Sequence, residues 1–92
     1  MVYTITRYTR IKANQIGVVV KPSTNVNKKI DVYRNGIKIA SVGDTSYYDY
    51  PTYIKLYGRE YADERRRLYR IRHKSDRKKR FSPGWLANWL LW

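Results

Sequence analysis

Apolar and β-branched residues dominate the first 42 positions in short runs that predict β-strands. Residues 2–8 are β-branched and aromatic, and residues 16–20 form a short apolar run. The strongest local signal is Asn35-Gly36, because asparagine and glycine tolerate the positive φ angles of the turn that joins two antiparallel strands. The pattern predicts a β-hairpin over residues 30–41 within a small antiparallel sheet.

The chain between residues 43 and 58 follows no regular spacing of apolar positions. It contains five of the ten tyrosines, and we expect a loop that packs through them. Asp49 is placed to cap a short helix over residues 51–57, since proline is tolerated in the first turn and Gly58 would end the run.

Residues 59–75 give the clearest helical pattern in the chain. Acidic residues come early and basic residues late, which is the distribution that the helix dipole favours. Tyr61, Leu68 and Ile71 fall close to one face at helical spacing. We expect this stripe to pack against the sheet.

A second helix is predicted for residues 82–92, with Ser82 as its cap and Pro83 at its first position. Apolar side chains surround it almost completely, so it has to be buried in the domain or in a partner. We favour closure of the domain's own core, with some rings left at the surface for a neighbour. The candidate partner-docking residues are Trp85, Trp89 and Trp92.

Together these elements predict one α+β domain over residues 1–92. It comprises a small antiparallel sheet within residues 1–42, an arginine-rich helix at 59–75, a basic linker at 76–80 and an aromatic helix at 82–92. A chain of 92 residues has room for one modest core. No segment is long and apolar enough for a signal peptide or a membrane span, so we expect neither.

Charge changes the picture more than any other property. The net charge is +13, whereas solubility of a small domain needs only about 2 to 8. Residues 1–42 and residues 59–80 each carry +7, and such regions attract polyanions. Arginine forks bind phosphates and carboxylates, and flanking tyrosines can stack on bases. The candidate polyanion-binding residues are Arg65, Arg66, Arg67, Arg70, Arg72, Arg77, Lys78, Lys79 and Arg80. The alternative is a basic helix that is only a solvated face.

Catalytic chemistry has little support in the sequence. There is no cysteine and only one histidine, His73, which excludes disulfides, thiolate nucleophiles and a structural zinc cage. No motif for nucleotide, zinc-protease or esterase chemistry is present. We therefore expect no catalytic residues, no cofactor and no metal. A nuclease built on Asp44, Asp49 and His73 beside a bound phosphate is the weakest alternative.

Several short motifs follow the predicted hairpin in order. They are Gly43-Asp44 with Asp49-Tyr50, then Asp63-x-x-Arg66-x-x-Tyr69-x-x-Arg72-His73, then Pro83-Gly84-Trp85 and Leu90-Leu91-Trp92. Over residues 28–92 the chain resembles a family of small basic proteins of unknown function encoded by large DNA viruses of algae and amoebae. The resemblance implies a viral origin and a shared module, and it supplies no mechanism.

A non-enzymatic viral structural protein is the function that these features favour. We expect a minor virion or capsid component, part of a larger assembly, that binds acidic capsid proteins or packaged DNA. It would be found in the virion, and in the host cytoplasm or nucleus during infection. The alternative is a free nucleic-acid-binding accessory protein, and a nuclease-like enzyme comes third.

Overall fold

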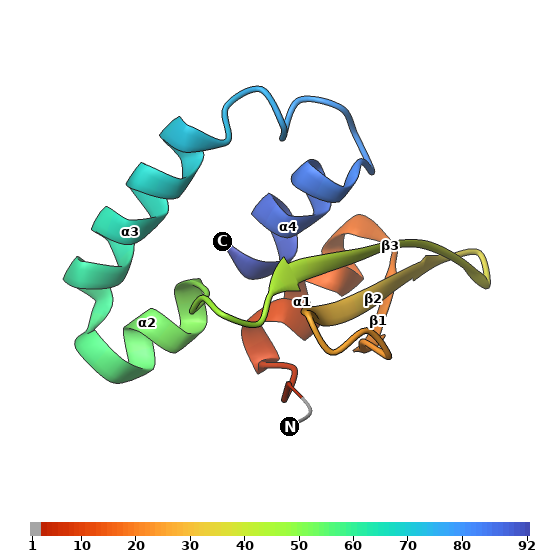
Figure 1. Ribbon diagram of the computed structural model, residues 1–92, viewed down its shortest axis with the longest axis horizontal. Coiled ribbons are helices and arrows are strands. Elements are labelled where there is room, and N and C mark those ends of the chain that lie inside the picture. The colour runs from red at the N-terminus through yellow and green to blue at the C-terminus, as the bar shows by residue number, and fades with distance from the viewer. Residues whose placement is uncertain (1–2) are drawn as a thin grey trace.

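A three-stranded antiparallel sheet and four helices make up the part of the chain that the computed structural model describes, residues 3–92 (Figure 1). The predicted α+β class is confirmed. In chain order the elements are α1 (Arg7–Ile16), β1 (Val19–Pro22), β2 (Lys28–Arg34), β3 (Ile37–Asp44), α2 (Tyr50–Tyr57), α3 (Arg59–Arg72) and α4 (Pro83–Leu91).

The sheet has the order β1-β2-β3, and its central strand provides the most buried apolar side chains. Ile30 and Val32 on β2 are fully buried. The turn between β2 and β3 is at Asn35-Gly36, with φ angles of 54° and 79°, as the sequence predicts. A β-bulge next to Val32 interrupts the register between β2 and β3.

The strand expected over residues 2–8 is corrected, because residues 3–6 form no regular element and helix α1 begins at Arg7. α1 begins after Thr6, whose side-chain oxygen accepts a hydrogen bond from the Thr9 amide, and it ends at Gly17 in the left-handed conformation. Thr9 and Ala13, four residues apart, are its buried positions. Positions 1–2, which include the expected strand residue Val2, lie outside the described residues. The apolar run at 16–20 forms a strand only from Val19 onward.

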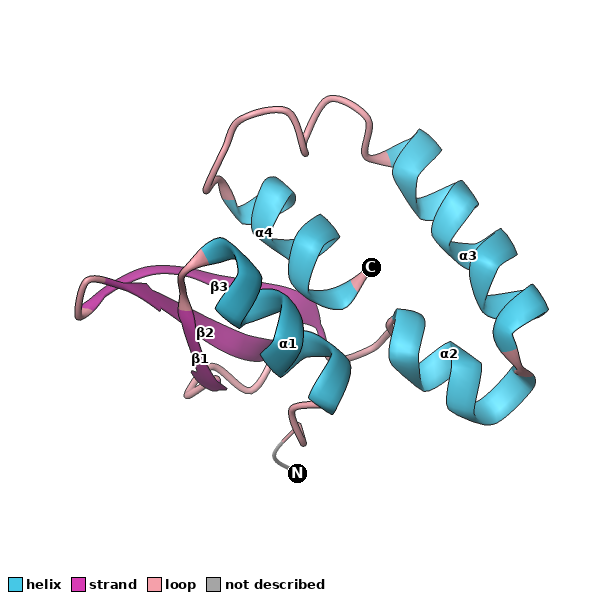
Figure 2. Cartoon of the chain, turned by 180° about the vertical axis from the view of Figure 1, so that it is seen from behind, coloured by secondary structure: helices cyan, strands magenta, loops and turns pink. Residues whose placement is uncertain are grey.

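Helix α4 closes the core against one face of the sheet, together with α1 (Figure 2). Leu86, Leu90 and Leu91 are almost completely inaccessible to solvent. The Thr9 hydroxyl donates a hydrogen bond of 2.7 Å to the carbonyl of Leu90, which fixes α1 to α4. The helix starts as predicted, because the Ser82 side chain accepts from the Trp85 amide and Pro83 occupies the first position. The C-terminal segment therefore belongs to the core.

Helix α3 lies away from the sheet, which corrects the expected packing of its apolar stripe. Its contacts are made mainly with α2, and the two helices form an arm beside the sheet (Figure 1). Tyr61, Leu68 and Ile71 are all exposed, Ile71 to 61%. The reason is that α1 and α4 already cover the face of the sheet that α3 was expected to cover. The helix also ends at Arg72, three residues before the predicted boundary.

Two leucine- or isoleucine-to-alanine variants test this correction. Leu90→Ala should lower the free energy of unfolding by about 2–5 kcal/mol, because it leaves a cavity in the core. Ile71→Ala should change it by less than about 0.5 kcal/mol, because that side chain is already exposed. Urea unfolding followed by circular dichroism measures both. A large loss for Ile71→Ala would mean that α3 packs through its apolar stripe after all.

Candidate anion-binding interface

Aromatic contacts hold the α2–α3 arm to the rest of the molecule. The ring of Trp92 stacks on Tyr69 of α3, with centroids 4.4 Å apart and planes 10° apart, and it also contacts Tyr53 of α2 at 6.0 Å. Tyr50 of α2 also contacts Tyr8 of α1, with ring centroids 5.6 Å apart, and within the arm it donates a hydrogen bond of 2.5 Å to Asp63 of α3. Because these contacts come from few positions, much of α3 stays accessible on two opposite flanks.

One flank of α3, with the chain just beyond it, forms an open hollow of about 490 Å³. We call it the basic hollow. Its lining contains five basic residues and one acidic residue. The lining residues are Asp63, Arg66, Arg67, Arg70, Ile71, Lys74 and Arg77.

Two of these arginines already have partners within the protein. Arg67 donates two hydrogen bonds to Glu64, at 3.0 and 2.6 Å, and this pairing raises the pKa of Arg67. Arg66 lies 3.6 Å from the Asp63 carboxylate and 3.9 Å over the ring of Tyr50. Both side chains are therefore partly neutralised before any ligand arrives.

Arg70, Lys74 and Arg77 have no acidic or aromatic partner within residues 3–92. Partial burial lowers the pKa of Arg70, and the positive charges of Arg66 and Arg77 lower it further. The Nε atom of Arg77 is buried and makes no hydrogen bond to the described chain. The hollow thus contains repelling cations and unused donors, and a bound anion would relieve both.

The nine predicted polyanion-binding residues fall into three groups. Arg66, Arg67, Arg70 and Arg77 line the basic hollow, whereas Arg65 and Arg72 lie on the opposite flank of α3, where they line a second pocket. Lys78, Lys79 and Arg80 are exposed in the segment between α3 and α4, and Arg80 lies 5.2 Å from the centre of the Phe81 ring.

Lys74 belongs to the basic hollow although the sequence reasoning did not select it. The signal that could have found it is helical spacing, because Arg66, Arg70 and Lys74 follow one another at intervals of four residues. The density of basic residues along the chain favoured the linker residues Lys78, Lys79 and Arg80 instead.

The three tryptophans predicted to dock a partner do not share one environment. Trp92 is buried between Tyr53 and Tyr69. Trp85 is half-buried, while Trp89 is exposed and lies under the ammonium of Lys12. Trp89 is thus the most accessible of the three for a neighbouring molecule.

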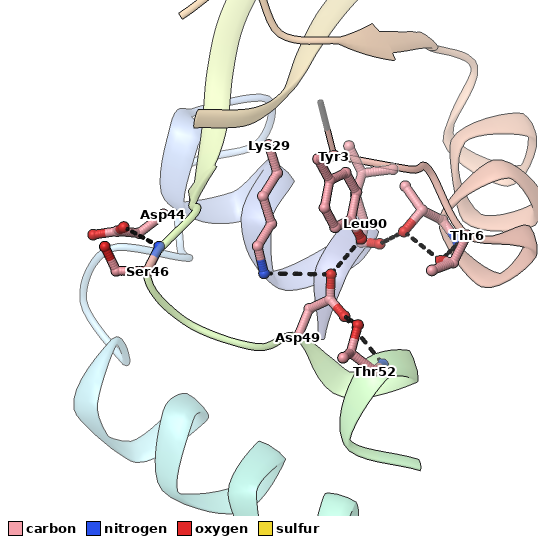
Figure 3. A network of polar contacts seen from close by, with 9 residues as sticks. Tyr3, Thr6, Lys29, Asp44, Ser46, Asp49, Thr52 and Leu90 are labelled. Carbon is pink, nitrogen blue, oxygen red and sulfur yellow. Dashed lines mark hydrogen bonds and ion pairs between the residues drawn. The ribbon is translucent and has the colours of Figure 1, made fainter. Parts of the chain in front are cut away.

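The residues of the nuclease hypothesis serve structural roles. The buried carboxylate of Asp49 accepts hydrogen bonds from the Tyr3 hydroxyl and from the amide and hydroxyl of Thr52, and it lies 3.5 Å from the Lys29 ammonium (Figure 3). As predicted, it caps the helix that follows. Burial lowers the pKa of Lys29, and the charge of Asp49 opposes this shift.

Asp44 and His73 also have local partners. Asp44 accepts a hydrogen bond of 2.8 Å from the Ser46 amide, which lowers the pKa of its carboxyl group (Figure 3). Nδ1 of His73 lies 3.0 Å from the carboxylate of Asp76. Across residues 3–92, no three His, Cys, Asp or Glu side chains gather closely enough to hold a metal ion.

Comparisons with known proteins leave the function open. No family model, no curated protein and no solved structure matches the chain. None of the helices over residues 3–92 has the length and apolar character needed to cross a membrane.

Removing the charge of Arg70 and removing the charge of Arg67 should change the stability of the protein in opposite directions. Arg70→Gln should stabilise the protein at low salt by roughly 0.2–0.5 kcal/mol, because it removes the repulsion from Arg66 four residues away. Arg67→Gln should destabilise it, because it breaks the pair with Glu64. Thermal unfolding at low and high ionic strength measures both effects, which should shrink with added salt. Destabilisation by Arg70→Gln would show that Arg70 has a partner in the folded protein.

Proposed function

We propose that the protein is a non-enzymatic nucleic-acid-binding protein that holds the phosphate backbone in the basic hollow. The observation that carries this proposal is the set Arg70, Lys74 and Arg77, three cations that share one hollow and have no acidic partner within the described chain. Phosphate oxygens are suitable partners, because guanidinium groups bind them through paired, charge-assisted hydrogen bonds.

The other basic region offers fewer free cations. Five of the eight basic residues in positions 1–42 lie over an aromatic ring or beside a carboxylate, so their charges are already used in the fold. These residues are Lys12, Lys21, Lys29, Arg34 and Lys38. This difference favours α3 over the sheet as the binding surface.

The resemblance to proteins of large DNA viruses suggests where this binding takes place. We propose a minor structural component of the virion that contacts packaged DNA. The same arginines could bind carboxylates of acidic capsid proteins, and the accessory protein made only during infection is the remaining alternative. Presence at stoichiometric copy number in purified particles, measured by mass spectrometry, supports the virion role, and absence from them supports the accessory role.

Two double variants with the same loss of charge test the binding surface. The magnitude of the slope of log K against log salt for duplex DNA should fall by about two units in Arg70→Gln/Arg77→Gln, since each phosphate contact contributes about 0.9. Lys21→Gln/Lys38→Gln removes two charges from the sheet and should leave the slope nearly unchanged. Fluorescence anisotropy of a labelled duplex, titrated at several salt concentrations, provides the slopes. Equal changes in both variants would show that only net charge matters and would contradict a defined site.

A further inference from the structure

The second pocket lies on the flank of α3 opposite the basic hollow. It has a volume of about 350 Å³, within the range of about 300–1,000 Å³ that is typical of small-ligand sites. Its walls come from β2, from β3 and the loop that follows it, from α2 and α3, and from the C-terminal end of the chain. We call it the aromatic pocket.

Six of the thirteen residues that line this pocket carry aromatic rings. Trp92, Tyr69 and His73 make a continuous stack, with both neighbouring pairs of centroids 4.4 Å apart. Tyr48 packs edge-on against Tyr53 at 5.6 Å and remains 48% exposed, and Tyr47 beside it is more exposed still. Such rings provide stacking surfaces for a planar ligand.

Cations line the same pocket. Arg65 and Arg72 have no acidic partner within residues 3–92, and Nε of Arg65 is buried without a hydrogen-bond partner there. Lys29 differs, because it is already paired with Asp49. The guanidinium of Arg65 lies over the Tyr53 ring at 5.5 Å. Two guanidinium groups without a carboxylate partner beside stacked rings suit a ligand that combines a planar ring with an anionic group.

Asp44 restricts the class of ligand that the aromatic pocket can bind. Asp44 also lines the pocket, and its negative charge would repel a ligand that is negatively charged throughout. A carboxylate accepts several hydrogen bonds, so Asp44 retains capacity for a ring N–H or amino group beyond its bond from Ser46. A nucleotide has both parts, a neutral base with N–H donors and an anionic phosphate.

We infer that the aromatic pocket binds one unstacked nucleobase of a single strand, with Arg65 and Arg72 on its phosphate. This inference rests on the proposed function, because the basic hollow across α3 would hold other phosphates of the same strand. The two sites are separated by the width of one helix, about 10–12 Å with its side chains. Single-strand-binding modules that combine cations with stacking rings cover roughly 4–16 nucleotides, enough to reach both.

The experiment compares two single-stranded oligodeoxynucleotides of equal length, one intact and one with abasic sites that keep every phosphate. The full chain should bind both with similar salt dependence, because the charges are the same. The intact strand should bind at least about fivefold more tightly, since stacking of one base contributes about 1–3 kcal/mol. Anisotropy of labelled strands measures both affinities.

A pair of tyrosine variants locates the effect. Tyr48→Ala should remove most of the preference for the intact strand, because it removes a ring that lines the pocket. Tyr57→Ala is the matched control, since Tyr57 also contacts Tyr53 and is 57% exposed but does not line the pocket. Circular dichroism and thermal unfolding establish that each variant is folded.

The outcomes separate this inference from the proposed function. Equal affinity of the unmodified protein for intact and abasic strands, with salt-dependent binding of both, overturns the base pocket and leaves the backbone site standing. A preference lost equally in both tyrosine variants also overturns it. Failure of both strands to bind overturns this inference, and failure of duplex DNA to bind as well overturns the proposed function.

Discussion

Burial of the uncharged C-terminal helix is the constraint on which the rest of the structure depends. Helix α4 contains no charged residue, and its leucines at 86, 90 and 91 would expose a large apolar surface if the helix were left in water. It therefore covers the sheet together with α1. In so small a domain that face has no room for a third helix.

Helix α3 therefore lies beside the sheet and not on it, and this position leaves both flanks of the helix available for the two candidate sites. A helix packed against the sheet through Tyr61, Leu68 and Ile71 would have one flank covered. As an arm with α2, it keeps the basic hollow on one flank and the aromatic pocket on the other. Trp92 belongs to both the core and the aromatic pocket, because it is buried next to α4 and also lines the pocket. The apolar side chains that remain exposed on α3 are a cost of this arrangement.

Features that depend on a few neighbouring residues could be predicted from the sequence. The turn at Asn35-Gly36, the cap at Asp49 and the start of the last helix at Ser82 each follow from the conformational preference of one or two side chains. The strand expected at residues 2–8 was wrong, because β-branched composition alone does not place a segment in a sheet: residues 3–6 form no regular element, and the helical spacing of Thr9 and Ala13 belongs to a helix that begins at Arg7. The predicted position of α3 was wrong, because an apolar stripe shows that a helix has an apolar face but does not show which helix packs against the sheet.

The two candidate sites also differ in how far they could be predicted from the sequence. Charge density selected four residues of the basic hollow, since most of that hollow lies on one helix. Helical spacing would have added Lys74. The aromatic pocket could not be predicted, because it joins residues as distant as Lys29, Tyr48 and Trp92, which only the tertiary fold brings together.

We expect the polyanion to bind at α3 and not at the equally basic first region. Amide chemical shifts of the ¹⁵N-labelled protein, followed during titration with a short DNA duplex, test it most directly. Binding at α3 should give shifts that concentrate on residues 63–77 and saturate together, with little change at Lys21 and Lys38 on the sheet. Shifts that concentrate on the sheet, or that spread evenly over all surface cations, would contradict it.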